Sequence, residues 1–224
     1  MNREARREYE EQLAKRRRRM RSIRNFAFLL VPFAIILGVV ALTNNSDSGN
    51  SNSSAKTEYA TLKTSMGDIV VQLSTKEAPK SEAQFVKLAK QGFYNGLTFH
   101  RVSSSTGIIQ SGDPKGDGTG GSGHQLKDEL PKTAYQIGDL AFANSGPNTS
   151  DSQFFIVTGQ PGTQLGKNYN RFGKVIAGLD VAQKIEGLSP ASGDGPPTTP
   201  VTLESVTISS KNPVTTTTTT TTAP

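Results

Sequence analysis

The feature that most constrains this chain is a succession of short runs rich in β-branched and aromatic residues, with few helical segments between them. Two segments have apolar residues at helical spacing: one opens at Pro79 and closes at Gly92, and the other covers residues 178–186. Strands that do not alternate with helices do not build a parallel α/β sheet. The pattern predicts a mainly β fold, a closed antiparallel barrel with helices at its ends. The runs expected to form strands are 59–62, 68–73, 97–102, 108–110, 138–143, 153–158, 172–176 and 201–208.

The positive charge of the chain lies in its first segment. The formal net charge is +6, but residues 1–25 hold 10 Lys and Arg against 4 Asp and Glu, and the remainder holds 15 against 15. Nucleic-acid binding needs basic residues spread over a folded surface, so it is not expected here. Cysteine is absent and histidine occurs only at His100 and His124, which argues against disulfides, thiol catalysis and a zinc enzyme. No metal or cofactor is expected.

An uncharged run of 17 residues, from Phe26 to Leu42, follows the basic segment. At about 1.5 Å per residue, a helix of this length nearly crosses the hydrocarbon core of a bilayer. The positive-inside rule keeps the basic flank in the cytoplasm. We expect residues 26–43 to be a transmembrane signal-anchor helix in the cell membrane, with residues 1–25 inside and the large domain outside. A cleavable signal peptide is the alternative, because residues 39–41 resemble a cleavage site.

The segments on either side of the domain are too polar to form a core. Residues 44–57 are mostly Asn, Ser, Gly and Asp, which predicts a flexible linker. Residues 210–224 contain a run of threonines, which predicts a disordered Thr-rich tail or, alternatively, a glycosylated or wall-spanning stalk. The folded domain is therefore expected to occupy residues 58–209.

Several simple motifs in the domain lack the context that their chemistry requires. Residues 116–121 match the glycine spacing of a dinucleotide-binding loop, but no helix opens at the last glycine to bind a phosphate. We interpret this segment as a loop that uses glycine for positive φ angles. No serine lies in a nucleophile elbow. Four acidic residues that do not have calcium-loop spacing are interpreted as solvated loop residues: Asp113, Asp117, Asp128 and Glu129.

Three segments form a pattern that needs neither acid–base nor nucleophilic chemistry. They are Phe-His-Arg at 99–101, Gln-Ser-Gly-Asp at 110–113, and residues 142–156, which include Phe-Ala-Asn, Gly-Pro-Asn-Thr and Ser-Gln-Phe-Phe-Ile. With residues 78–94 and 172–175, these segments resemble the cyclophilin family of peptidyl-prolyl cis/trans isomerases. The resemblance implies an eight-stranded antiparallel β-barrel capped by two α-helices, which agrees with the strand pattern.

The resemblance also implies the catalytic residues. An X-Pro bond rotates slowly because amide resonance imposes a barrier of about 18–20 kcal/mol. In cyclophilins an arginine weakens this resonance by donating a hydrogen bond towards the prolyl nitrogen, and Arg101 matches that position. A guanidinium suits the task because it stays charged and its fork can be held by a second residue. Gln110 matches the residue that orients it.

The substrate-binding residues follow from the same resemblance. Ile108, Phe155 and Leu165 are expected to surround the proline ring. Ala143 and Asn144 match the edge that pairs with the substrate backbone, Gln153 a polar contact, and Tyr169 a position near the proline carbonyl. His100 flanks the site, with a structural role at least as well supported. The wall of the neighbouring pocket is expected to consist of Gly118, Thr119 and Gly120.

Residues 103–108 depart from the family pattern. This segment is one residue longer than usual and lacks the phenylalanine and methionine found there in most members. Gly107 stands in the aromatic position and Ile108 replaces part of the methionine, so we expect proline binding to weaken by about 1–3 kcal/mol if nothing else fills the space. Gln164 stands where cyclosporin-sensitive members have tryptophan, which predicts weak cyclosporin binding.

The residues thus favour a membrane-anchored, monomeric isomerase that acts on proline-containing polypeptides and assists the folding of exported proteins. A non-catalytic binding module or holdase that uses the same groove is the alternative, because the loop after Arg101 is altered. A third hypothesis, a structural linker between membrane and envelope, rests on the threonine tail.

Overall fold

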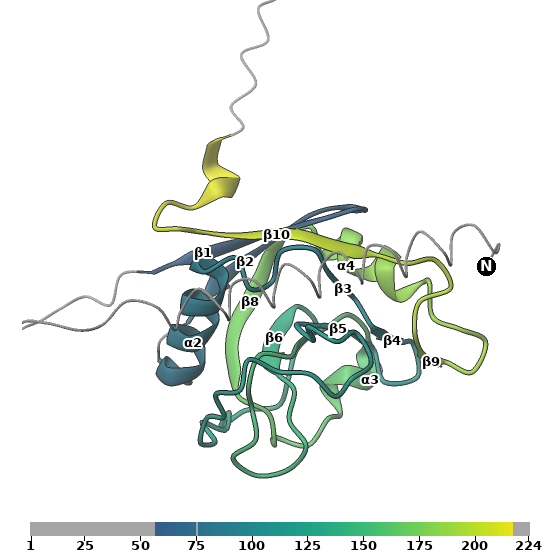
Figure 1. The fold of residues 1–224 in the computed structure, drawn as a ribbon, viewed down its shortest axis with the longest axis horizontal. Coiled ribbons are helices and arrows are strands. Elements are labelled where there is room, and N and C mark those ends of the chain that lie inside the picture. Colours follow the sequence, from purple (N-terminus) through teal and green to yellow (C-terminus); the bar gives the residue numbers. More distant parts are fainter. Residues whose placement is uncertain (1–56, 75, 217–224) are drawn as a thin grey trace, which may run out of the picture. The chain divides into compact units, whose positions relative to one another are not determined.

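A computed structural model describes residues 57–74 and 76–216, which form one curled antiparallel sheet with a few helices (Figure 1). The strand order is β3-β10-β1-β2-β8-β6-β7-β5-β4-β9. The prediction of a mainly β, antiparallel fold is confirmed. In this part of the chain no helix is long and apolar enough to cross a membrane. The expected cytoplasmic segment and membrane anchor lie outside the described residues, as do almost all of the linker and half of the tail.

The sheet has ten strands where eight were predicted. Every predicted strand is present, but the run 97–102 is interrupted at residues 99–100 and forms two strands, and β9 was not predicted. β9 is an Asp-Gly pair, a sequence typical of turns, so nothing in its composition indicates a strand. The strands are β1 (Tyr59–Thr64), β2 (Gly67–Leu73), β3 (Leu97–Thr98), β4 (Arg101–Ser103), β5 (Ile108–Ser111), β6 (Asp139–Phe142), β7 (Phe154–Val157), β8 (Arg171–Ala177), β9 (Asp194–Gly195) and β10 (Thr202–Ser209).

The two ends of the sheet are brought together by the chain itself. β3 pairs with β10 at one edge, whereas β4, which follows almost at once, pairs with β5 and β9 at the other. The hydroxyl of Ser111 in β5 donates a hydrogen bond of 2.9 Å to the carbonyl of Thr98 in β3. No ladder joins β3 to β4 or β9 in the described strands, so the sheet is a curled half-barrel whose two edges are linked by the chain between β3 and β4.

Both predicted helices are present, at opposite sides of the sheet (Figure 1). α2 (Pro79–Lys90) begins with proline, whose fixed φ suits the first helical turn, and contacts β8 and β10. α4 (Leu179–Glu186) contacts β2, β4 and β5. A third helix, α3 (Gln160–Thr163), was not predicted because a single turn has no periodic pattern to detect. A 3₁₀-helix, η1 (Pro213–Thr216), follows the last strand.

Strand β7 separates two apolar clusters. Successive side chains of a strand point to opposite faces, so Phe154 and Ile156 enter the main core while Phe155 and Val157 enter a second cluster. The main core packs phenylalanine rings from α2 and the sheet at centroid distances of 4.5–5.6 Å. The second cluster is smaller and lies at the predicted proline site. Its members are Ile108, Tyr135, Ala141, Phe155 and Val157, with Ile137, Ala143, Leu165 and Tyr169 partly buried against it.

Candidate active site

The sheet register puts the predicted catalytic pair beside the predicted proline site. Arg101 lies opposite Gln110 across β4 and β5, Gln110 lies opposite Phe155 across β5 and β7, and Phe155 lies opposite Ala141 in β6. Residues directly opposite one another in antiparallel strands have their side chains on the same face. One row across four strands therefore carries the guanidinium, the amide that was expected to orient it, and the aromatic wall.

A continuous chain of hydrogen bonds runs from Arg101 to the glycine loop. Arg101 Nη1 donates to Gln110 Oε1 at 3.2 Å, and Gln110 Nε2 donates to Gln153 Oε1 at 2.9 Å. Gln153 Nε2 then donates to the carbonyls of Gly118 and Gly120, at 2.9 and 2.8 Å. A guanidinium only donates, so each amide in the chain has one possible orientation. The structure thus brings five of the predicted site residues together.

The sequence reasoning missed the strongest partner of Arg101. Asp194 in β9 accepts hydrogen bonds from Arg101 Nε at 2.7 Å and from Nη2 at 2.6 Å, a bidentate ion pair. These hydrogen bonds hold the pKa of the Asp194 carboxyl below its usual range. With the bond to Gln110, three of the five guanidinium N–H donors are used. One N–H on each of Nη1 and Nη2 has no partner among the residues that the structure describes.

The altered loop after Arg101 supports the strand that carries Asp194. The amide of Ser105 donates to the carbonyl of Gly193 at 3.1 Å, and the amide of Ser104 donates to Ser189 Oγ at 2.8 Å. The register then sets Asp194 opposite Ser103. The serine turn and the segment before β9 are therefore one hydrogen-bonded unit next to the guanidinium.

The space expected to be empty at Gly107 is filled by backbone. Gly107 has φ +70°, and a Cβ atom there would lie 2.8 Å from both the carbonyl oxygen of Gly159 and the amide nitrogen of Gly162. The carbonyl of Gly107 also accepts a 2.8 Å hydrogen bond from the amide of Thr158. An aromatic side chain at this position is excluded by α3 and the residue before it, so its loss does not leave a hole beside Gly107.

The residues predicted to hold the proline ring gather in the second apolar cluster. Ile108 and Phe155 are buried, and Leu165 and Tyr169 are partly buried against them. The rings of Phe155 and Tyr169 meet edge to face at 5.2 Å. The sequence reasoning missed Tyr135, which is 2% exposed and whose ring lies 6.3 Å from that of Phe155.

A cavity of about 330 Å³ adjoins this cluster. Asn144, at its edge, donates through Nδ2 to the carbonyl of Asn168 at 2.7 Å. Ala143 lines the cavity and also packs on the apolar cluster, so the two sites share a wall. Among the lining residues are seven that were predicted: Gln110, Gly118, Thr119, Gly120, Ala143, Asn144 and Gln153.

The interpretation of the acidic loop residues as merely solvated is wrong, because all four accept hydrogen bonds from backbone amides; Glu129 and Asp113 bind the most distant and the largest number of them. Glu129 accepts hydrogen bonds from the backbone amides of Lys80 and Ser81 in the first turn of α2, at 3.0 and 2.8 Å. Asp113 is buried and organises the glycine loop; a Cβ atom at Gly120 would collide with its carboxylate. The Asp113 carboxylate accepts hydrogen bonds from the backbone amides of Lys115, Asp117 and Gly118.

His100 lies beside the site, in the interruption between β3 and β4. Both ring nitrogens are buried without a hydrogen-bond partner among the described residues. Burial lowers the pKa of His100 below its ordinary value, although the nearby Asp113 carboxylate acts in the opposite direction. In residues 57–74 and 76–216 no group of three or more His, Cys, Asp or Glu could hold a metal ion.

Comparison with known proteins agrees with this geometry. The family model described as "Cyclophilin type peptidyl-prolyl cis-trans isomerase/CLD" matches residues 59–208. The chain belongs to the cyclophilin family. A Mycobacterium tuberculosis protein described as "Probable peptidyl-prolyl cis-trans isomerase B" is 42% identical over 161 residues, covering 64% of this chain and 52% of that protein. A peptidyl-prolyl cis-trans isomerase of Helicobacter pylori is 43% identical over 137 residues, covering 59% and 82%.

This cyclophilin spans about half the length of the mycobacterial relatives that it matches. A crystal structure of a cyclophilin-type isomerase from Cryptosporidium parvum has 32% sequence identity and a TM-score of 0.62, covering 70% of this chain and 99% of that one. A structure of that protein in the presence of the dipeptide Ala-Pro has a TM-score of 0.61. The similarity therefore covers the domain that carries the candidate active site.

Proposed function

We propose that this protein is a peptidyl-prolyl cis/trans isomerase, with Arg101 as its catalytic residue. The observation that carries the proposal is a guanidinium held on two sides beside an apolar cluster. Gln110 and Asp194 accept hydrogen bonds from three of its N–H donors, and the other two have no partner within residues 57–74 and 76–216. The names of the curated relatives support the same activity.

In the proposed mechanism the protein weakens amide resonance and performs no covalent chemistry. One free N–H of Arg101 donates to the prolyl nitrogen as that nitrogen becomes pyramidal during rotation. This interaction is stronger in the transition state than in the planar ground state, which is the condition for acceleration. Because Gln110 and Asp194 fix the guanidinium beforehand, little reorganisation is needed when the bond rotates.

We propose that the substrate is a proline-containing polypeptide in an extended conformation. The proline ring enters the cluster of Ile108, Phe155 and Leu165, which offers apolar surface without polar groups. Ala143 and Asn144 pair with the substrate backbone, and the substrate residues before the proline enter the adjoining cavity. The Ala-Pro dipeptide used with the Cryptosporidium structure is of this chemical class.

We also propose that the chain is a monomer anchored in the cell membrane through residues 26–43, with the isomerase domain outside, where it assists the folding of exported proteins. The uncharged run and its basic flank support this topology. Protease added to intact cells should digest the domain and leave residues 1–25 protected. Protection of the whole chain would overturn the topology, and a dimeric mass in detergent would overturn the monomer.

The activity is tested with the full chain in detergent micelles, by NMR exchange measurement of cis-to-trans conversion in a short X-Pro peptide. We expect acceleration by the wild type and its loss in Arg101→Ala. Lys184→Ala, which removes an exposed cation from α4, is the matched control and should keep full activity. Peptide binding without acceleration would instead favour a binding module or holdase.

A further inference from the structure

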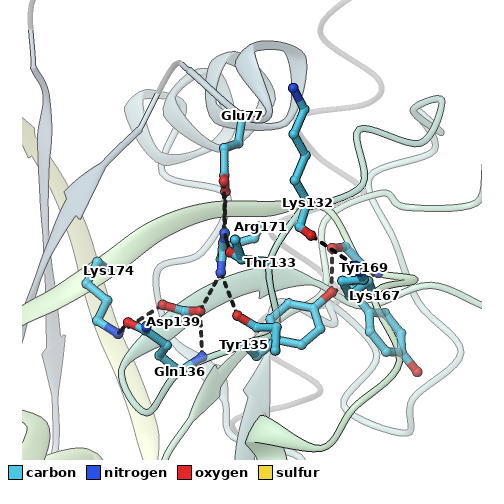
Figure 2. A network of polar contacts seen from close by, with 11 residues as sticks. Glu77, Lys132, Thr133, Tyr135, Gln136, Asp139, Lys167, Tyr169, Arg171 and Lys174 are labelled. Carbon is cyan, nitrogen blue, oxygen red and sulfur yellow. Dashed lines mark hydrogen bonds and ion pairs between the residues drawn. The ribbon is translucent and has the colours of Figure 1, made fainter.

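The irregular segment 132–137 contributes Tyr135 to the second apolar cluster and accepts hydrogen bonds from three cationic side chains (Figure 2). Arg171 donates to Thr133 Oγ1 at 2.9 Å and to the carbonyl of Ala134 at 3.2 Å. Lys167 Nζ donates to the carbonyl of Lys132 at 2.9 Å, and Lys174 Nζ donates to that of Ile137 at 2.8 Å. The segment is therefore fixed at both of its ends.

The cation at the centre of this arrangement is itself held by carboxylates (Figure 2). Arg171 pairs with both oxygens of Glu77 at 2.8 Å and with Asp139 at 3.0 Å. The side chain of Asp139 is 5% exposed and also accepts from Lys174 at 3.0 Å. The Arg171 and Asp139 side chains are only 13% and 5% exposed, and separating a buried ion pair costs free energy because each charge is left without its partner, so this pair resists displacement of the segment.

Tyr135 projects from the middle of this segment into the cluster. Its ring packs on Phe155, and its hydroxyl reaches the backbone of Tyr169 twice (Figure 2). The hydroxyl donates to the carbonyl of Tyr169 at 2.7 Å and accepts from the amide of the same residue at 3.0 Å. Both backbone polar groups of Tyr169 thus share one partner.

Tyr169 has no regular secondary structure to hold it. It lies in the irregular stretch between α3 and β8, so its position depends on contacts from outside the stretch. Its own ring meets Phe155 edge to face at 5.2 Å. Displacement of the Tyr169 backbone would therefore change the shape of the surface expected to receive the proline ring.

We propose that Tyr135 is a positioning residue of the isomerase site: its hydroxyl holds Tyr169 against Phe155 and so sets the shape of the proline pocket. The inference rests on the proposed isomerase function. Burial raises the pKa of Tyr135 to about 12, so the hydroxyl keeps the proton that it donates throughout the physiological range.

The test removes only the hydroxyl. Tyr135→Phe keeps the ring against Phe155 and loses both hydrogen bonds to Tyr169. The pocket binds the proline ring equally well in the ground state and in the transition state. Loss of the two hydrogen bonds should therefore raise KM by about three- to tenfold and leave kcat within twofold. The matched control is Tyr94→Phe, which removes a hydroxyl that donates to the carbonyl of Ser152 in the main core; its KM should stay within twofold of the wild type.

A spectroscopic readout accompanies the kinetics. With ¹⁵N-labelled tyrosine the backbone amide of Tyr169 gives one of five tyrosine signals, and it should shift in Tyr135→Phe because its acceptor is gone. A shifted Tyr169 signal with unchanged KM would overturn the proposal. An equal rise of KM in Tyr94→Phe would also overturn it, because the effect would then belong to any lost buried hydroxyl.

A substitution at the surface provides a second test if Tyr135→Phe does not fold. Thr133 is exposed, and Thr133→Val removes one of the ties to Arg171. A smaller rise of KM with a shifted Tyr169 signal is expected, and an unshifted signal with unchanged KM would contradict the proposal. If the wild type shows no isomerase activity, the proposed function fails; peptide affinity, measured by titration, then still shows whether Tyr135 shapes the pocket.

Discussion

Replacing Asp194 by asparagine should separate the catalytic role of the ion pair from its effect on stability. Asparagine has the shape of aspartate but no charge. Its oxygen can accept one of the two hydrogen bonds that Asp194 takes from Arg101, while its amide nitrogen turns hydrogens towards the other donor. The guanidinium therefore keeps its bond to Gln110 and loses its bidentate partner.

The size of the effect follows from the exposure of the pair. The side chains of Arg101 and Asp194 are 36% and 40% exposed, so water replaces much of what is lost and the free energy of unfolding should fall by only about 0–1 kcal/mol. For catalysis, one charge-assisted hydrogen bond, discounted for this exposure, is worth about 1 kcal/mol of positioning. Because a tenfold change in rate corresponds to 1.36 kcal/mol, we expect kcat/KM to fall about fivefold, mainly in kcat.

The pH dependence gives the sign of the charge effect. Because Arg101 lowers the pKa of Asp194, the ion pair is intact above the ordinary carboxyl pKa and is lost only as the pH falls through the lower folded value. The ratio of wild-type to Asp194→Asn activity should therefore be constant between about pH 5 and pH 8, since Asp194 stays ionised throughout this range.

NMR exchange on an X-Pro peptide measures kcat and kcat/KM for the wild type and for Asp194→Asn. Thermal unfolding measures the stability of each protein. Asp180→Asn is the matched control, because Asp180 is also exposed and pairs with Lys184 at 3.0 Å, on α4. Wild-type kcat in Asp194→Asn would refute the positioning argument. So would an equal loss in Asp180→Asn.

Three further predictions concern stability, the loop and inhibitor binding. Burial, and to a smaller extent the charge of Glu58, raises the pKa of Glu82 to about 7. The folded state therefore loses stability as the pH rises from about 4.5 to 7. Glu82→Gln removes this loss and should raise Tm by about 2–4 °C at pH 8 and not at pH 5. An unchanged Tm difference between the two pH values would contradict this. Gly107→Phe, which restores the aromatic residue usual in the family, should destabilise the domain and not tighten peptide binding, since Gly159 and Gly162 occupy its space; isothermal titration and thermal melts would show the reverse if the reasoning fails. Cyclosporin should bind weakly because Gln164 replaces tryptophan, and submicromolar affinity by calorimetry would refute that expectation.

The strands and the two longer helices could be predicted because their signals are local. β-Branched and aromatic runs mark the strands, and apolar residues at helical spacing mark α2 and α4. Elements that span only about one period of these patterns gave no signal, because a period must repeat to be detected. α3 has four residues and β9 has two, and both position groups at the site: Gly162 against Gly107, and Asp194 against Arg101.

Candidate site residues could be predicted where a resemblance pointed to them, and their supports could not. Arg101 and Gln110 are close in sequence and lie in conspicuous motifs. Asp194 is 93 residues from Arg101, in an Asp-Gly pair that reads as a turn. Tyr135 is 34 residues from Tyr169 and lies in an irregular segment. Only the folded chain brings these pairs together, so neither composition nor spacing could indicate them.

The altered loop and the missed carboxylate belong to the same structural unit. The turn at residues 103–106 is held by the segment before β9, and β9 presents Asp194 to the guanidinium. The extra residue and the serines, which suggested a weakened site, also allow the turn to hold the partner of Arg101. Proline-ring affinity and arginine positioning therefore have different supports in this cyclophilin. Weaker binding of the proline ring would raise KM, whereas poorer positioning of Arg101 would lower kcat.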